Sequence, residues 1–156
     1  MGFISGKYSL TYDGSTVGQI KDGIRLNHSV FKRLITGDNF ADAPQDAIFR
    51  GMEMFAEYTL LEYNATKAAL AMWPYGSGYL NMSVVIGTLD SANAKQIVMT
   101  ALTGTPAAAA PATVTFPLAI LAEGFPVQLL FAPDLREIPI RQRLYPNSSG
   151  VFGTLT

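Results

Sequence analysis

Apolar and polar positions alternate over the longest stretch of this chain between Ala47 and Tyr63. Apart from Arg50, one set of alternate positions is apolar: Ile48, Met52, Met54, Ala56, Tyr58 and Leu60. The other set mixes Glu53 and Glu57 with apolar residues, so the pattern predicts a β-strand with a core face and an amphipathic second face. At about 3.3 Å per residue this strand would reach about 56 Å, far beyond the usual strand. It therefore either bends at Gly51 or serves something larger than one small domain.

Shorter alternating runs predict the other strands. Residues 6–12 form the first, and Asp13-Gly14 after them predicts a hairpin because both central residues of a type I′ turn need positive φ. A short strand over 16–21 and a turn at Asp22-Gly23 lead into the next strand. Further strands are expected over residues 24–35, 80–88, 95–103, 112–123, 126–131 and 135–145. Pro117 must then lie at an edge or a bulge.

One helix is expected to flank these strands. Asn64 is a good N-cap, the helix covers about residues 65–73, and Pro74 ends it. Its stripe of small and apolar residues suits close packing on a sheet. The segment 104–111 is low in complexity and predicts a mobile loop, and the Ser/Gly-rich tail from about residue 147 is expected to be loosely held.

The chain carries few charges for its length. Its 156 residues correspond most simply to a single domain, residues 1–156. Hydrophobic residues make up 49% and charged residues 15%, against about a quarter charged in average soluble domains. Two interpretations fit: a compact β-protein with a large core, or a subunit whose apolar surface is covered by other subunits.

Charge and residue types exclude several classes of function. The 11 basic and 12 acidic residues are spread along the chain, so no basic patch for sequence-specific nucleic-acid binding is present. Without cysteine, disulfides, thiolate chemistry and cysteine-ligated metals are impossible, which fits a reducing compartment. The N-terminal residues lack the apolar region of a signal peptide, and no apolar run reaches 18 residues. We therefore expect a soluble chain, cytoplasmic when made, without membrane insertion.

No motif for catalysis or cofactor binding is present. The sequence lacks a phosphate-binding loop, a Gly-x-Ser-x-Gly elbow and a His-Glu-x-x-His motif. His28, the single histidine, stands among apolar positions without a nucleophile or second ligand at a diagnostic spacing, which favours a structural role. Asp38, Asp42 and Asp46 lack the ligand spacing of an EF-hand loop. The sequence thus predicts no enzyme, no cofactor and no metal site.

The order of elements resembles the tail-tube proteins of long-tailed bacteriophages. From Thr16 to Pro74 the chain runs strand, acidic loop with Gly-Asp-Asn-Phe, long strand, capped helix and Trp-Pro. Later segments, Thr-Phe-Pro-Leu and Ile-Pro-Ile-Arg-Gln-Arg-Leu-Tyr-Pro, are similar to the C-terminal halves of that family. The resemblance covers roughly residues 5–146, and the order of elements carries it.

This resemblance implies a mainly β fold, a β-sandwich or half-barrel of two antiparallel sheets with one flanking α-helix. Six copies would form a ring, the inner sheets would join into a closed barrel, and stacked rings would form the tail tube of a virion, assembled in the host cytoplasm. The implied partners are further copies of the chain, the terminator, the baseplate or tip, the tape measure and, where present, a sheath. Double-stranded DNA would pass through non-specifically during ejection.

The resemblance also implies two sets of site residues. A stacking loop over residues 36–47 would contact the neighbouring ring through Thr36, Gly37, Asp38, Asn39, Phe40, Asp42 and Asp46. The flanking strands would line the lumen with Arg25, Asn27, Ser29, Arg33, Glu53 and Glu57. Acidic walls repel phosphates, and the arginines here would offset that charge, with a cross-strand pair of Arg25 and Glu57 as one way to neutralise it.

Two other functions remain open from the sequence. A tail terminator, a neck protein or a tube-initiating ring would share the same fold, so the resemblance does not separate them from a tube subunit. A β-domain that binds carbohydrate through Trp73, Tyr75 and Tyr79 is a third possibility from another class of protein.

Overall fold

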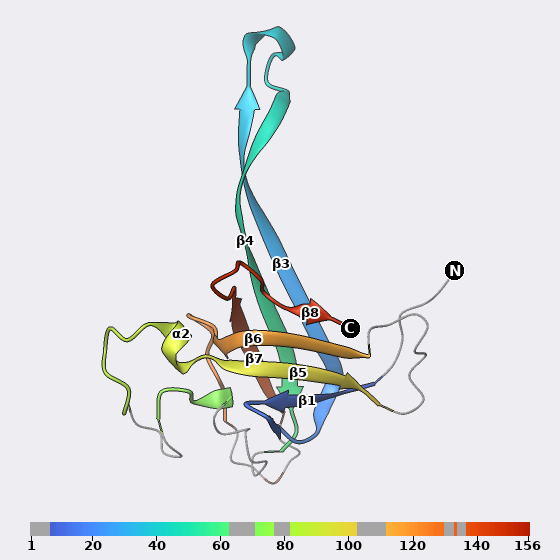
Figure 1. The fold of residues 1–156 in the computed structure, drawn as a ribbon, viewed down its shortest axis with the longest axis vertical. Coiled ribbons are helices and arrows are strands. Elements are labelled where there is room, and N and C mark those ends of the chain that lie inside the picture. Colours follow the sequence, from blue (N-terminus) through green and yellow to red (C-terminus); the bar gives the residue numbers. More distant parts are fainter. Residues whose placement is uncertain (1–6, 63–70, 77–81, 103–111, 130–132, 134–136) are drawn as a thin grey trace.

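The computed structural model describes residues 7–62, 71–76, 82–102, 112–129, 133 and 137–156. They form a mainly β fold, as expected, in one open antiparallel sheet of eight strands with the order β2-β1-β5-β6-β7-β4-β3 and β8 beside β6 (Figure 1). The strands are β1 Tyr8–Tyr12, β2 Ser15–Thr16, β3 Ile20–Thr36, β4 Pro44–Leu60, β5 Lys95–Ala101, β6 Thr113–Leu121, β7 Ile138–Tyr145 and β8 Thr154–Leu155. A 3-10 turn η1, Asp38–Phe40, and a short helix α2, Asp90–Asn93, complete the described elements.

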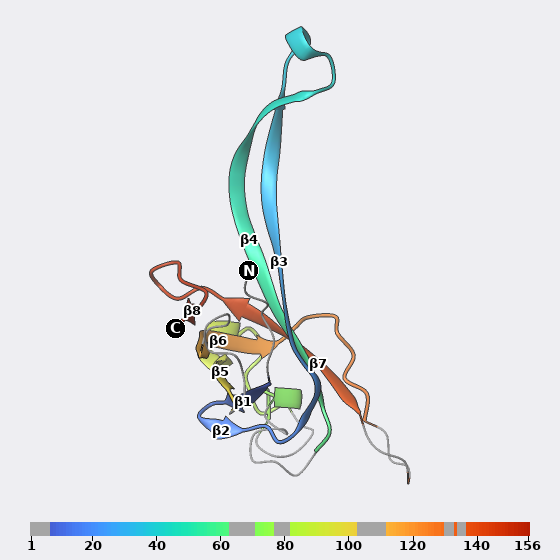
Figure 2. The same ribbon diagram turned by 90° about the vertical axis from the view of Figure 1, so that its right-hand side faces the viewer.

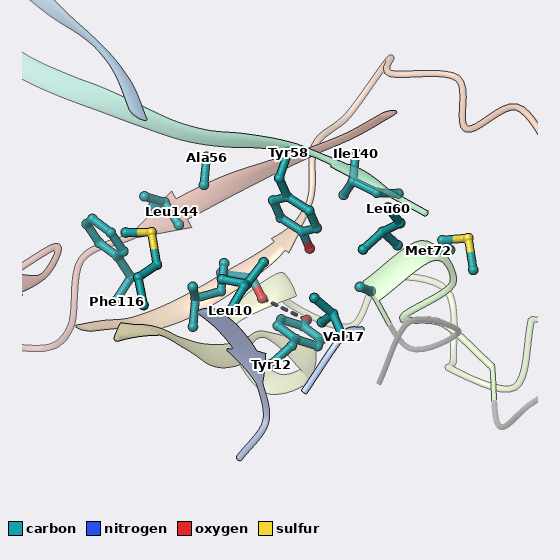
Figure 3. Packing of buried hydrophobic residues seen from close by; sticks show 14 of the residues in the cluster. Leu10, Tyr12, Val17, Ala56, Tyr58, Leu60, Met72, Phe116, Ile140 and Leu144 are labelled. Carbon is teal, nitrogen blue, oxygen red and sulfur yellow. Dashed lines mark hydrogen bonds between the residues drawn. The ribbon is translucent and has the colours of Figure 1, made fainter. Parts of the chain in front are cut away.

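The sandwich is made by one sheet that folds over, where two sheets were expected. Strands β6 and β7 share only four paired positions, Leu118–Leu121 against Gln142–Tyr145, and the sheet turns there (Figure 2). Side chains of β1, β5 and β6 therefore face those of β4 and β7 across a single core (Figure 3). The core includes Leu10, Tyr12, Ile97, Met99, Val114, Phe116, Ala56, Tyr58, Leu60, Ile138, Ile140 and Leu144.

Strands β3 and β4 form a hairpin that is much longer than the body of the protein. Each strand has 17 residues, and β7 pairs with β4 only along Met54–Leu60. The other half of the hairpin projects from the body as a two-stranded ribbon (Figure 1). We call this projecting part, residues 30–52, the arm.

The pairing of β3 with β4 shifts at three places, and two of these shifts determine which side chains share a face. Asp22 and Gly23, expected to form a turn, instead make a bulge inside β3, with φ of 59° and 73° and a register shift between Lys21 and Ile24. A bend at Gly51 is one of the two alternatives for the long stretch, and the structure has a bulge there, because the φ of Gly51 is 127° and the pairing shifts between Phe31 and Lys32. This second bulge moves Ile48 from the core-facing set, where the alternation had placed it, to the face that carries Glu53.

Two local predictions at turns and bulges are confirmed. Asp13 and Gly14 have φ of 52° and 80°, and they join β1 to β2 in the expected hairpin. Pro117 lies at a register shift between β5 and β6, as a residue without a backbone N–H requires. The helix expected over 65–73 and the loop over 104–111 lie mostly or wholly outside the described residues. Ala71 and Met72, the described part of that helix, are helical and buried in the core.

Three predictions from alternation or composition are wrong. Described residues 82–88 form no strand, and neither do residues 126–129. The C-terminal tail is fixed rather than loose, because Asn147 Oδ1 accepts the backbone N–H groups of Ser149 and Val151 at 2.9 and 3.0 Å. β8 then pairs with β6, and Phe152 packs on the core. In the part of the chain that the structure describes, no helix has the length and apolar character needed to cross a membrane.

Candidate functional site

The face of β3, β4 and β7 that points away from the core carries most of the residues expected to line a lumen. The register places Arg25 opposite Glu57, as anticipated, and Ser29 opposite Glu53. Asn27 lies between them, opposite Phe55. Arg33 is on the same side of β3 but eight residues up the strand from Arg25, about 26 Å away, in the arm. Five of the six residues therefore lie together.

Strand β7 adds to this face two arginines that were not among the predicted lumen residues. Arg141 is paired in register with Glu57, and Arg143 with Phe55. We call the whole surface the outer face. It consists of Lys21, Arg25, Asn27, Ser29, Glu53, Phe55, Glu57, Glu123, Glu137, Arg141 and Arg143.

Ion pairs run across the outer face. Arg143 Nη1 lies 3.2 Å from Glu53 Oε2, while its Nε donates to Glu123 Oε2 at 2.9 Å and its Nη2 donates to the other oxygen of Glu123. Arg141 Nε lies 3.4 Å from Glu57 Oε1. The carboxylate of Glu57 thus pairs with Arg141, whereas the sequence suggested Arg25 as its partner.

Phe55 is buried without belonging to the core. Its ring lies on the outer face, yet it is only 7% exposed. The guanidinium of Arg141 covers the ring at 3.9 Å from its centroid, and that of Arg143 does so at 4.5 Å. Both cations therefore gain a cation–π contact in addition to their carboxylates, and Phe55 restricts where they can move.

The hydrogen bonds between Arg143 and Glu123 favour the charged forms of both side chains. They lower the pKa of the Glu123 carboxyl below its ordinary value, although partial burial opposes that shift. The bonds to Glu123 raise the pKa of Arg143. On the neighbouring row, the hydrogen bond to Glu137 raises the pKa of Lys21. Lys21, Glu123 and Arg143 therefore remain ionised throughout the physiological pH range.

The outer face has no net charge. It holds four cations, Lys21, Arg25, Arg141 and Arg143, and four carboxylates, Glu53, Glu57, Glu123 and Glu137. An acidic wall, the surface typical of the resemblance, is therefore not what this chain presents. Its carboxylates are matched by its own cations.

The arm exposes large apolar side chains on both faces. On the side that continues the core face, Leu34 is 59% and Phe49 is 63% exposed. On the side that continues the outer face, Ile48 is 53% exposed and Phe31 is 48% exposed. β3 is also the last strand of the sheet, so its outer hydrogen-bonding edge is unpaired over the described chain. Such an edge is normally protected in a monomer.

The residues of the expected stacking loop lie at the far end of the arm (Figure 1). Thr36 ends β3, Gly37 is extended, Asp38–Phe40 form η1, and Ala41 turns the chain with φ of 53°. Asp42 is exposed in the turn. The loop is shorter than expected, because β4 already begins at Pro44. Asp46 lies within that strand, where its Oδ1 accepts the N–H of Ala47 at 2.7 Å.

A second apolar surface was missed because its residues had been assigned to a strand. Met82, Val85, Ile86 and Leu89 are each at least 74% exposed in the segment that leads into α2. The alternation of residues 80–88 predicts a strand with one covered side, but Met82 and Ile86, which would share that side, are 74% and 88% exposed. This segment is a further candidate contact.

The aromatic residues considered for carbohydrate binding are engaged with each other and with Asp90. Trp73 and Tyr75 pack edge to face, with ring centroids 6.5 Å apart. The hydroxyl of Tyr75 donates to Asp90 Oδ1 at 3.2 Å, and that of Tyr145 donates to Asp90 Oδ2 at 2.9 Å. Tyr79 lies outside the described residues. These contacts fasten α2 to β7 and leave the hydroxyl of Tyr75 already bonded.

Neither the histidine nor the acidic residues form a chemical centre in the described structure. His28, expected to be a structural residue, is exposed on β3 opposite Met54. No group of three or more His, Cys, Asp or Glu side chains that could hold a metal ion occurs among residues placed by the structure.

No protein-family model and no curated protein matches this chain.

Proposed function

We propose that this protein is a structural subunit of a phage-type tail tube, in which hexameric rings stack and conduct DNA, and that it has no catalytic activity. The observation that carries the proposal is the arm. It is a two-stranded ribbon with apolar side chains on both faces, and the body of the described chain covers neither face. The hexameric state and the tube come from the resemblance in the order of elements.

The arm would be unfavourable in a monomer, because nothing would cover its apolar side chains. A two-stranded ribbon in water is marginally stable at best, since it has no third layer to bury its apolar face. Phe31, Leu34, Ile48 and Phe49 each leave about half of the side chain in water. Covering the exposed half of each would contribute about 1 kcal/mol per residue, taking about 2 kcal/mol for a fully buried side chain. Neighbouring subunits are the natural source of that cover.

The same hairpin supplies the second requirement of a tube, a wall that faces the cargo. Below the arm, β3 and β4 carry the outer face, whose charges balance. In a ring this face would lie toward the lumen, while the free edge of β3 would pair with a neighbour and so lose its exposed N–H and C=O groups. The tip of the arm, with Asp38 and Asp42, would reach the next ring.

Assembly of the purified full chain tests the proposal. Light scattering and negative-stain microscopy should show rings or tubes for the wild type. Phe49→Lys should prevent assembly without lowering the melting temperature, because it places a charge where a neighbour must pack while disturbing no buried contact. Val151→Lys, a partly exposed apolar residue on the body, serves as the matched control and should assemble.

Two results would count against the proposal. One is a strictly monomeric wild type at high concentration, and the other is normal assembly of Phe49→Lys. Rings that never lengthen would instead assign the chain to a terminator, neck or tube-initiating ring. Phe40→Ala combined with Asp38→Ala at the tip should leave rings intact and block their stacking.

A further inference from the structure

We propose that the outer face is a charge-compensated wall, in which carboxylates of the subunit itself hold the guanidiniums of Arg141 and Arg143 and thereby keep them from the phosphates of double-stranded DNA. The placement of this face in a channel rests on the proposed function. The masking of the arginines does not, because all the groups involved belong to one subunit.

The first support is the number of donors that Arg143 uses. Its Nε, Nη1 and Nη2 all point to carboxylate oxygens of Glu53 and Glu123. A guanidinium binds phosphate best when it can present two parallel N–H groups, and that fork is already occupied by Glu123. Arg143 is also only 20% exposed, so DNA could reach it only after these bonds break.

The second support is the position of Phe55. Its ring lies under both guanidiniums, whose Cζ atoms are 3.9 and 4.5 Å from the ring centroid. An arginine free to swing out on its long side chain could meet a phosphate well above the surface. Here the ring contacts both guanidiniums and the carboxylate of Glu53 binds Arg143, while Glu57 holds Arg141 by an ion pair at 3.4 Å without a hydrogen bond to its Nε among the described residues.

The third support is the balance of charge. Unpaired arginines repeated around a ring would bind the phosphate backbone, since each neutralised phosphate releases counterions. A wall of carboxylates alone would instead repel the phosphate backbone. Four cations matched by four carboxylates do neither at a distance, and this is the arrangement that suits a sliding polyanion.

The test removes the carboxylates and leaves the cations. The triple variant Glu53→Gln, Glu57→Gln and Glu123→Gln keeps side-chain shape but frees two guanidiniums, those of Arg141 and Arg143. The matched control is Asp13→Asn, Asp22→Asn and Glu62→Gln, which changes the net charge equally at exposed positions outside both the outer face and the stacking loop. Binding of a labelled 20-base-pair DNA duplex to the full chain is measured by fluorescence anisotropy at about 50 and 200 mM salt.

We expect the triple variant to bind the duplex and the control to resemble the wild type. Two phosphate contacts correspond to a salt slope of about −1.8, so binding should weaken about 12-fold over the fourfold rise in salt. Adding Arg141→Gln and Arg143→Gln to the triple variant should remove most of that binding. If the triple variant does not fold, Glu57→Gln alone, at a partly exposed ion pair that contributes little to stability, should bind with a slope near −0.9.

The proposal is wrong if the triple variant binds no better than the control, or if the wild type binds as tightly as the triple variant. Neither result depends on assembly. A subunit that forms tubes but whose triple variant ignores DNA would keep the proposed function and refute the masking. A subunit that never assembles but whose triple variant binds DNA would do the reverse.

Discussion

Two buried tyrosines allow a matched test of how much a hydrogen bond to a buried hydroxyl contributes to the stability of the core. Tyr12 and Tyr58 face each other across the sandwich, from β1 and β4 (Figure 3). The hydroxyl of Tyr12 donates to the backbone carbonyl of Ala119 at 2.9 Å. The hydroxyl of Tyr58 is equally buried but has no hydrogen-bond partner among the described residues. The same substitution, Tyr→Phe, should therefore have opposite effects at the two positions.

The magnitudes follow from what each hydroxyl does. Tyr12→Phe removes a hydrogen bond and leaves a buried carbonyl short of a donor, which should lower the free energy of unfolding by about 1 kcal/mol. Tyr58→Phe removes a group that was desolvated without compensation, at a cost of about 1–3 kcal/mol, and should raise the free energy of unfolding by up to that amount. For a chain of this length, each 1 kcal/mol shifts the melting temperature by about 2–4 °C.

Urea unfolding of the full chain, followed by far-ultraviolet circular dichroism at a concentration without assembly, measures both variants. The dependence of the free energy on urea should be unchanged, so that shifts in the midpoint report stability alone. Equal destabilisation by Tyr12→Phe and Tyr58→Phe would refute the reasoning. It would mean that the Tyr58 hydroxyl has a partner, such as a buried water, worth as much as the carbonyl of Ala119.

Two further predictions concern the tail and alkaline pH. Gly153→Ala would place a Cβ 2.4 Å from the Phe116 ring and 2.7 Å from the Thr115 carbonyl oxygen. It should therefore lower the free energy of unfolding by about 1–3 kcal/mol. Ser148→Ala, at an exposed position, should leave it unchanged, and thermal melting compares the two variants. Burial raises the pKa of Tyr12 and Tyr58, and burial with the Asp90 hydrogen bond raises that of Tyr145 to about 12. The unfolded chain therefore loses tyrosine protons from about pH 10 while the folded chain keeps them, and stability is full below pH 10 and falls as pH rises above it. An unfolding midpoint that is the same at pH 9 and pH 11 would contradict this.

The features that could be predicted from the sequence are those set by local backbone chemistry. Asp13-Gly14 and Pro117 impose φ values or remove a donor, so a turn and a bulge follow whatever the tertiary structure. Asp22-Gly23 shows the limit of that reasoning. Its positive φ values were correctly implied, but the same conformation serves a bulge in a continuous strand as well as a turn.

The composition of the outer face could be predicted only in part, because it depends on which strands are neighbours. Arg25 and Glu57 are far apart in the sequence, but the hairpin connects their strands directly. Their positions opposite each other in the register could therefore be anticipated. Arg141 and Arg143 come from the end of the chain, and nothing local indicates that β7 lies beside β4. The alternation within residues 138–145 indicated a strand with one polar face, but it did not indicate which strand lies beside it.

The arm explains why the long alternating stretch had two faces that were both too apolar for water. The bulge at Gly51 brings Phe49 onto the side of Leu26, Val30 and Leu34, so the core face of the sheet continues up the arm. The described body covers that face only at its lower end, where Ala56 and Tyr58 are buried. The apolar face thus extends over 17 residues, and the described chain covers only about half of it. Exposed apolar surface of this kind is disfavoured in a monomer, and the proposed assembly would cover it with a neighbouring copy.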